Sequence, residues 1–171
     1  MKKFFESLRA RFDGATDKND GQVIIALDIS NSMLAEDVQP SRLQKAKRLV
    51  SQLVDKMEND KVGMIVFAGD AFTQLPITSD YISAKMFLET IDPSLISKQG
   101  TALGAAINLS TRSFTPMEGV GRTVILITDG ENHEDGALEA AKAAVEKGIQ
   151  INVLGVGMPE GAPIPIPGSN D

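Results

Sequence analysis

The chain alternates between two hydrophobic patterns, one typical of buried strands and one typical of amphipathic helices. Unbroken apolar runs rich in Val and Ile lie at 23–29, 62–68, 123–128 and 151–156. A run without polar alternation predicts a strand that is buried on both faces, as in a parallel sheet. The stretch Thr73–Thr78 contains a proline, which favours an edge strand, and we predict that this strand is antiparallel to the rest.

Segments with helical period separate these runs, and they predict helices over 41–57, 80–90, 101–114 and 136–147. The side chains that we expect to face inward are Leu43, Ala46, Val50, Leu53 and Met57 in the first helix, Ile82, Met86 and Phe87 in the second, Leu103, Ile107 and Phe114 in the third, and Leu138, Ala141 and Val145 in the fourth. Ser41 and Gln44 have the spacing of a capping box, and Gly148 marks the end of the last helix.

Strands that alternate with helices of this length predict right-handed βαβ crossovers. We therefore expect an α/β fold of the Rossmann-like, doubly wound type, with a mainly parallel sheet, one antiparallel edge strand and helices on both faces. The length of 171 residues suits one domain. We expect residues 1–20 to be an N-terminal extension or linker, because 13–21 is polar and rich in Gly and Asp, and residues 21–171 to form the domain.

Composition excludes several classes of partner and chemistry. The formal net charge is −6 and no block of Lys and Arg is present, which argues against nucleic acid and against an anionic membrane surface as partners. The absence of cysteine excludes disulfides, thiolate chemistry and Cys-ligated metal sites. No apolar run approaches the roughly 20 residues that span a bilayer, so we expect this chain to be soluble, without direct membrane insertion.

Oxygen-bearing side chains follow two of the predicted buried strands. Asp28, Ser30 and Ser32 lie at the end of the first run, Asp129 follows the third, and Thr101 stands where a loop enters a helix. In open α/β sheets, ligands bind beyond the carboxyl ends of the strands. Because hard cations such as Mg²⁺ and Mn²⁺ prefer oxygen ligands, we expect these five residues to form a divalent-cation site. If the neutral hydroxyls are the inner ligands, the ion stays electrophilic and suits a carboxylate from a partner.

Each of these positions also has a simpler structural interpretation. The first cluster could form a strand-end turn with local hydrogen bonds, and Thr101 could be the N-cap of its helix. Glu36 and Asp37 follow the first motif and could form an acidic rim, although we favour solvated loop charges. His133, the only histidine, could be a rim residue that affects ligand choice, although we favour an exposed loop residue without a role.

The order of the polar elements matches a known family. The matching positions are Asp28-x-Ser30-x-Ser32, Thr101 at a helix start, and Thr128-Asp129-Gly130. They resemble the metal-ion-dependent adhesion site (MIDAS) of von Willebrand factor A (VWA) domains. The resemblance implies the VWA fold for 21–171, with Ser30 and Ser32 as direct ligands and Thr101 as a direct ligand in the ligand-bound state. It implies that Asp28 and Asp129 act mainly through water, and that the cation is Mg²⁺, with Mn²⁺ or Ca²⁺ as alternatives.

More narrowly, three segments are similar to the Bacteroides aerotolerance (Bat) proteins, especially their BatB type: Asp28–Leu49, Val62–Thr78 and Gly155–Pro159. This resemblance implies a metal-dependent protein–protein interaction module in a bacterial envelope complex linked to aerotolerance or stress. The expected partners are a protein that presents Asp or Glu, a MoxR-type AAA+ ATPase, and other Bat or tetratricopeptide proteins. Bat proteins usually flank this domain with transmembrane helices and continue beyond it. We therefore expect an excised, C-terminally truncated domain of an inner-membrane-anchored protein, located in the periplasm.

An enzymatic alternative is a magnesium-dependent phosphohydrolase of the haloacid-dehalogenase type, which also places aspartates at strand ends. That chemistry needs a second aspartate two residues after the nucleophile, and position 30 is serine. No nucleophile–base pair and no phosphate-binding loop of the G-x-x-x-x-G-K-[ST] type is evident. We therefore do not expect the chain to be an enzyme.

Overall fold

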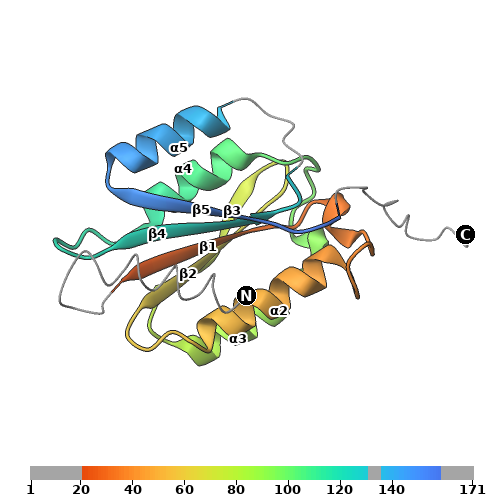
Figure 1. The fold of residues 1–171 in the computed structure, drawn as a ribbon, viewed down its shortest axis with the longest axis horizontal. Coiled ribbons are helices and arrows are strands. Elements are labelled where there is room, and N and C mark those ends of the chain that lie inside the picture. The colour runs from red at the N-terminus through yellow and green to blue at the C-terminus, as the bar shows by residue number, and fades with distance from the viewer. Residues whose placement is uncertain (1–20, 131–135, 159–171) are drawn as a thin grey trace, which may run out of the picture.

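A five-stranded sheet in the order β3-β2-β1-β4-β5 forms the centre of the fold (Figure 1). The computed structural model describes residues 21–130 and 136–158. The strands are β1 (Gln22–Asp28), β2 (Lys61–Phe67), β3 (Ala71–Thr78), β4 (Arg122–Thr128) and β5 (Ile149–Gly155). β1 pairs in parallel with β2 and β4, β4 pairs in parallel with β5, and β3 is antiparallel to β2. The predicted antiparallel edge strand is therefore confirmed.

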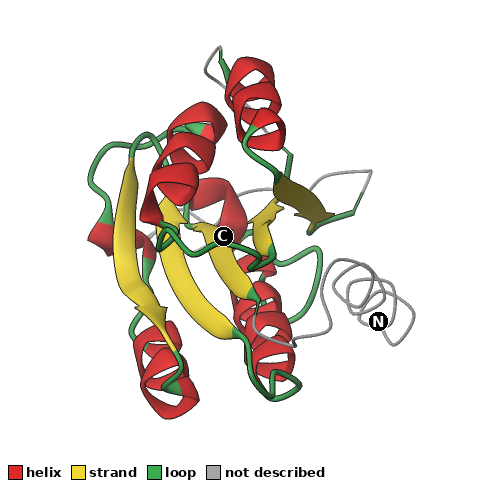
Figure 2. Cartoon of the chain, turned by 90° about the vertical axis from the view of Figure 1, so that its left-hand side faces the viewer, coloured by secondary structure: helices red, strands yellow, loops and turns green. Residues whose placement is uncertain are grey.

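Helices cover both faces of this sheet (Figures 1 and 2). One face carries α2 (Arg42–Val54) and α3 (Tyr81–Glu89), and the other carries α4 (Leu103–Ser113) and α5 (Ala137–Glu146). Two short 3₁₀ helices, η1 (Asn31–Leu34) and η2 (Pro93–Leu95), lie in the loops. The doubly wound α/β arrangement predicted from the sequence is confirmed.

The central strand explains why the fold has two hydrophobic cores. All seven residues of β1 are buried, and alternate side chains of a strand point to opposite faces. Val23, Ile25 and Leu27 pack in the core beneath α2 and α3, whereas Ile24 and Ala26 pack beneath α4 and α5. An unbroken apolar run is the pattern that this two-sided burial requires.

The start of α2 and the end of α5 are formed by the residues that the sequence predicted for them. Ser41 is the N-cap of α2, and its Oγ accepts a hydrogen bond from the backbone N–H of Gln44 at 3.2 Å. Gly148 follows α5 with a φ of +73°, a left-handed conformation that glycine adopts without steric cost. The predicted inward face of α2 is buried, apart from the partly buried Met57.

The predicted inward face of α3 is wrong, and that of α5 is wrong except at Ala141, which is partly buried against the core. Ile82 and Met86 are 77% and 66% exposed, and Phe87 and the α5 residues Leu138 and Val145 are also exposed. The buried positions are instead Ala84 and Leu88 in α3 and Ala140 and Ala144 in α5. Both helices carry apolar residues on more than one face, and the small alanines allow close approach to the sheet. The largest side chains therefore did not indicate the packed face.

β5 is less buried than its apolar run predicts. Only Ile149 is fully buried, and Val153 is exposed. The strand is the last in the sheet that the described residues form, so one of its edges has no strand neighbour within 21–130 and 136–158. The expectation of burial on both faces therefore holds for β1 and β4 but not for β5.

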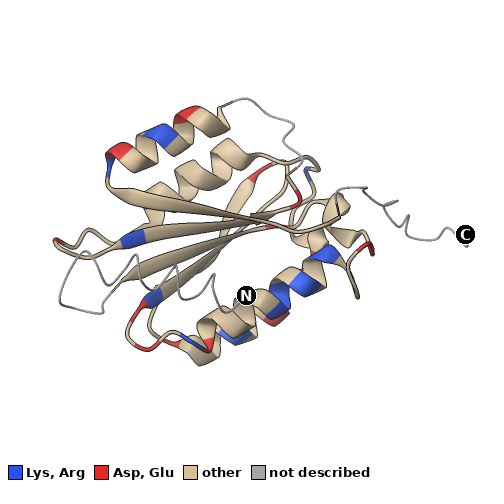
Figure 3. Cartoon of the chain, in the orientation of Figure 1, with Lys and Arg blue, Asp and Glu red and all other residues tan. Residues whose placement is uncertain are grey.

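Charged side chains are spread over several elements (Figure 3). Lys and Arg occur on α2 and at the starts of β2 and β4, and α5 carries both signs. Within the described part of the chain, no helix is both long and apolar enough to cross a membrane. The predicted N-terminal extension (1–20) and His133 lie outside the described residues.

Candidate functional site

The predicted site residues of β1 and β4 lie at the point where the strand order reverses. From β1 the chain continues to β2 on one side, whereas β4, on the other side, leads outward to β5. Asp28 is the last residue of β1, and Asp129 directly follows β4. The two strands are parallel, with Leu27 paired to Ile127, so their carboxyl ends meet at one edge of the sheet. This is the position at which ligands bind in open α/β folds.

Asp28 is buried and held by hydrogen bonds to both carboxylate oxygens. Its Oδ1 accepts from the backbone N–H of Ser30 at 2.9 Å, and its Oδ2 accepts from the hydroxyl of Thr128 at 2.7 Å. Burial raises the pKa of Asp28 to about 6, against the lowering effect of the hydrogen bonds from Ser30 and Thr128, and the nearby charge of Asp129 raises it further. The hydrogen bonds therefore fix the orientation of the carboxylate, but they do not balance its negative charge. A cation beside it would stabilise the ionised form.

Ser30 and Ser32 bring two hydroxyl oxygens together. The two hydroxyls are hydrogen-bonded to each other with their oxygens 3.0 Å apart, and both residues are buried. The 3₁₀ helix η1 produces this arrangement: the N–H of Met33 donates to the carbonyl of Ser30 at 3.0 Å, and the buried Met33 side chain anchors the turn in the core. The sequence predicted both serines as ligands but not the turn that pairs them.

The separation of these hydroxyls fits a small octahedral cation. Mg²⁺ binds oxygen at about 2.0–2.1 Å, so adjacent corners of its octahedron lie about 2.9 Å apart. The 3.0 Å between the Oγ atoms of Ser30 and Ser32 matches this separation. Two hydroxyls at this spacing could therefore be neighbouring ligands of one ion without rearrangement of the turn.

Thr101 is buried in a loop that contacts the segments after β1 and β2. The N–H of Ala102 donates to the carbonyl of Ala68 at 2.7 Å, just beyond β2. The side-chain oxygen of Gln99 accepts from the N–H of Asn31, which lies between the two serines, at 3.2 Å. The N-cap of α4 is Ala102, so the interpretation of Thr101 as the N-cap is wrong. A buried threonine beside the serine turn remains a candidate ligand.

Asp129 is held by an arginine that the sequence analysis did not single out. Its Oδ2 accepts from Nη1 of Arg42 at 2.9 Å. The same guanidinium donates from Nε and Nη2 to the two carboxylate oxygens of Asp37, each at 2.9 Å. Arg42 is the first residue of α2, where the helix dipole disfavours a positive charge, and this unfavourable position was the available signal of a specific partner.

The sequence analysis favoured a solvated loop charge at Asp37, and this interpretation is wrong. The Asp37 side chain is only 4% exposed and pairs with Arg42. The Arg42 guanidinium lowers the pKa of Asp37 to about 2, and the hydrogen bond from the N–H of Met158 contributes to the same shift. Asp37 also accepts from the N–H of its neighbour Val38 at 3.1 Å, but the contact with Met158 spans 121 residues and forms only in the folded chain, so the local sequence did not predict burial of this side chain.

The donor set is hydroxyl-rich. Among residues 21–130 and 136–158, no group of three or more Asp, Glu or His side chains is placed to hold a metal ion. Asp28 and Asp129 are thus accompanied by the hydroxyls of Ser30, Ser32 and Thr101 and not by further carboxylates. This composition suits a hard cation that keeps most of its charge and suits a soft metal poorly.

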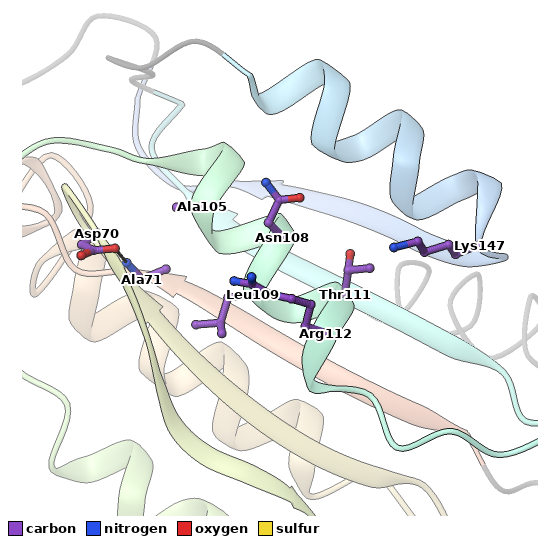
Figure 4. A pocket seen from close by; sticks show the side chains of 8 residues that line it. All are labelled: Asp70, Ala71, Ala105, Asn108, Leu109, Thr111, Arg112 and Lys147. Carbon is purple, nitrogen blue, oxygen red and sulfur yellow. Dashed lines mark hydrogen bonds between the residues drawn. The ribbon is translucent and has the colours of Figure 1, made fainter.

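A separate hollow lies along α4 (Figure 4). Its volume is about 350 Å³, and it is lined by Asp70, Ala71, Ala105, Asn108, Leu109, Thr111, Arg112 and Lys147. None of the five predicted site residues lines it, so the hollow is not part of the candidate cation site.

Comparison with known proteins identifies solved relatives. An aerotolerance-related membrane protein from Bacteroides fragilis is 79% identical, with a TM-score of 0.86, and the match covers 88% of this chain and 75% of that one. BatB from Bacteroides thetaiotaomicron is 83% identical, with the same TM-score, and the match covers 88% of this chain and 74% of that one. The chain spans about half the length, or less, of the curated relatives it matches.

A more distant relative shares the fold. Proximal thread matrix protein 1 from the mussel byssus, in a structure with a zinc-occupied MIDAS motif, is 22% identical with a TM-score of 0.69, and the match covers 80% of this chain and 35% of that one. The model of the von Willebrand factor type A domain matches residues 22–164. The chain therefore belongs to the von Willebrand factor type A domain family and is similar to the BatB proteins of Bacteroides, as its sequence motifs predicted.

Proposed function

We propose that this domain is a divalent-cation-dependent protein-interaction module. Asp28, Ser30, Ser32, Thr101 and Asp129 would hold the cation, and an Asp or Glu side chain of another protein would complete its coordination. The observation that carries the proposal is the 3.0 Å separation of the Ser30 and Ser32 hydroxyl oxygens beside the buried Asp28 carboxylate. That spacing fits adjacent ligands of a small octahedral ion.

The charge of the site supports recognition of an acidic group. Three of the five donors are neutral hydroxyls, and the carboxylate of Asp129 already accepts from the Arg42 guanidinium. The Asp28 carboxylate is therefore the main negative charge left to neutralise a cation at this edge. When bound, the cation supplies an electrophilic position for a partner's carboxylate.

The cation that we propose is Mg²⁺, with Mn²⁺ or Ca²⁺ as alternatives. The five candidate donors are all oxygen atoms, which Mg²⁺, Ca²⁺ and Mn²⁺ prefer. The mussel byssus relative holds zinc in its MIDAS motif, which supports a divalent ion in this fold without identifying it. Measured affinities for the separate ions will determine the choice.

The biological setting follows from the relatives and is part of the proposal. The Bacteroides fragilis relative is described as an aerotolerance-related membrane protein. We infer that the full-length protein is anchored in the inner membrane with this domain in the periplasm, as part of an envelope complex linked to aerotolerance or stress. A MoxR-type AAA+ ATPase and other Bat or tetratricopeptide proteins are the proposed partners.

Isothermal titration of the chelator-treated domain with Mg²⁺ and Mn²⁺ tests the cation site. We expect Thr101→Val, which replaces the hydroxyl by a methyl group of similar size, to weaken binding at least tenfold, and Thr101→Ser to keep it. Thr111→Val is the matched control, because the Thr111 hydroxyl donates within α4 to the carbonyl of Ile107. Equal cation affinity in Thr101→Val and wild type would contradict the assignment of Thr101.

The interaction itself is tested with the same variants. Immobilised domain is exposed to solubilised Bacteroides envelope proteins in Mg²⁺ or in chelator, and captured proteins are identified by mass spectrometry. We expect a captured protein that is lost both in chelator and with Thr101→Val, and that is kept with Thr111→Val. Capture that is indifferent to chelator would show a partner surface other than the cation site.

A further inference from the structure

Three charged side chains form a buried chain beside the candidate cation site. Arg42 lies between Asp37 and Asp129 and donates to both at 2.9 Å. The side chain of Arg42 is 7% exposed, and those of Asp37 and Asp129 are 4% and 1% exposed. Burying ionised groups is costly unless they are paired with opposite charges. The single positive charge of Arg42 is shared between the carboxylates of Asp37 and Asp129.

The segment after β5 completes this charged chain. The N–H of Met158 donates to Oδ2 of Asp37 at 2.7 Å. Gly157 has a φ of +135°, and a Cβ added to it would lie 3.0 Å from Nε of Arg42. The backbone of Gly157 therefore lies directly against the guanidinium. The N–H of Val156 donates to the carbonyl of Thr128 at 2.9 Å, which fixes the same segment beside Asp129.

We propose that Asp37 and Arg42 are positioning residues of the cation site, and that Gly157 and Met158 act through them. The proposal rests on the proposed function above. Asp37 draws the guanidinium toward itself, which limits the competition of Arg42 with a cation for the Asp129 carboxylate. Met158 holds Asp37 in place through its N–H, and Gly157 shields the Asp37–Arg42 pair from water, which strengthens that pair.

This arrangement couples cation binding to the position of the segment 156–158. A cation that attracts Asp129 leaves Asp37 as the main partner of Arg42, and the stronger Asp37–Arg42 pair favours the docked Gly157 and Met158. Coupling between two binding equilibria is reciprocal. Docking of the segment therefore raises cation affinity, and cation binding tightens the docking.

Titration of Mg²⁺ into charge variants tests the first half of this coupling. In Asp37→Asn, Arg42 keeps Asp129 as its only charged partner among the described residues. We expect binding to weaken roughly three- to tenfold, because one negative charge near the divalent ion is removed and Arg42 then competes more fully for Asp129. Asp80→Asn removes the same charge at the N-cap of α3, beyond the opposite end of β2, and we expect its affinity to change less than twofold.

The double variant Asp37→Asn with Arg42→Met tests whether Asp37 acts by limiting the competition of Arg42 for Asp129 or only by holding the local structure in place. It removes both Asp37 and Arg42 as charged groups, so no arginine is left without its main partner. It also serves as a second test if the single variant Asp37→Asn folds poorly. We expect its Mg²⁺ affinity to return at least to the wild-type value, because the competing guanidinium is gone. Wild-type affinity in Asp37→Asn would overturn the proposal, and so would a double variant that binds as weakly as Asp37→Asn.

Hydrogen exchange at the Met158 amide tests the second half. We expect saturating Mg²⁺ to slow this exchange severalfold in the wild type, and Asp37→Asn to show fast exchange with or without Mg²⁺. The amide of Ala84, which donates to the Asp80 carbonyl within α3, is the comparison site and should not respond. If Mg²⁺ binds but leaves Met158 unchanged, the coupling is wrong and the cation site stands. If Mg²⁺ does not bind the wild type, both proposals fall.

Discussion

Replacing the buried Asp28 by asparagine is expected to stabilise the cation-free domain at neutral pH. Burial raises the pKa of Asp28 from 3.8 to about 6. Because the folded state holds this proton more tightly than the unfolded state does, the contribution to stability is complete below about pH 4 and is lost as the pH rises through 6. A difference of about two pKa units corresponds to about 3 kcal/mol of lost stability at pH 7.5.

Asparagine has nearly the same shape and avoids this ionisation. Its Oδ1 can still accept from the N–H of Ser30, and its Nδ2 can donate to the hydroxyl oxygen of Thr128. The proton of the Thr128 hydroxyl then loses its acceptor, which costs about 1 kcal/mol. The net stabilisation by Asp28→Asn is therefore about 2 kcal/mol at pH 7.5. In a domain of this size, that difference raises the melting temperature by roughly 4 to 8 °C.

Thermal unfolding followed by circular dichroism in chelator at pH 7.5 and pH 4 measures the effect. We expect Asp28→Asn to be more stable than wild type at pH 7.5 and slightly less stable at pH 4, where wild-type Asp28 is largely protonated. Added Mg²⁺ at 100 times its Kd should stabilise the wild type by about 2.7 kcal/mol and leave the variant unchanged. A variant that is less stable than wild type in chelator at pH 7.5 would refute the claim that burial dominates at Asp28.

Two further changes test the support of the fold and of the site. Lys47→Met should lower the free energy of unfolding by about 1–3 kcal/mol in urea titrations. The reason is that the Lys47 ammonium donates to the carbonyls of Glu89 and Ile91 at 2.9 and 3.2 Å. Unchanged stability would show that these carbonyls find other partners. Gly69→Ala should weaken Mg²⁺ binding and lower the melting temperature, because the new Cβ would lie 2.4 Å from the Gln99 carbonyl oxygen and would displace the loop before Thr101. Gly155→Ala, whose Cβ would meet nothing within 4 Å, is the control, and equal behaviour of the two glycine variants would contradict this steric explanation.

The order and type of the elements could be predicted because their periods are strong. An apolar run such as that of β1 has one stable environment, the centre of a sheet with helices on both sides. The packed faces of α3 and α5 could not be predicted in this way. Ile82 and Leu138 increase the apparent hydrophobicity of faces that the fold leaves exposed, whereas Ala84 and Ala140 form the contact. Only the position of the neighbouring sheet decides between such faces.

The candidate ligands could be identified from the sequence because each is fixed by a local feature. Asp28 and Asp129 are placed by the ends of two parallel strands, which meet at one edge whatever the intervening sequence. The Arg42 contact with Asp129 spans 87 residues and depends on how α2 crosses the sheet, so the local sequence can indicate that Arg42 needs a partner but not which residue that partner is. The segment after β5 reaches Asp37 across 121 residues in the same way. The candidate ligand positions therefore follow from local features, whereas the pairing of their charges depends on the tertiary fold.

The two carboxylates of the site consequently have different electrostatic roles. Asp129 is paired with Arg42, so part of its negative charge is already balanced without a cation. Within the described part of the chain, the hydrogen-bond donors to Asp28 are neutral, and burial opposes its ionised form. A cation at this edge would therefore relieve the unfavourable ionisation of Asp28 while it competes with Arg42 for Asp129. The affinity for a cation thus depends on two effects: the gain from stabilising the Asp28 carboxylate, and the cost of competing with Arg42 for the Asp129 carboxylate. Asp37 reduces that cost because it also binds Arg42.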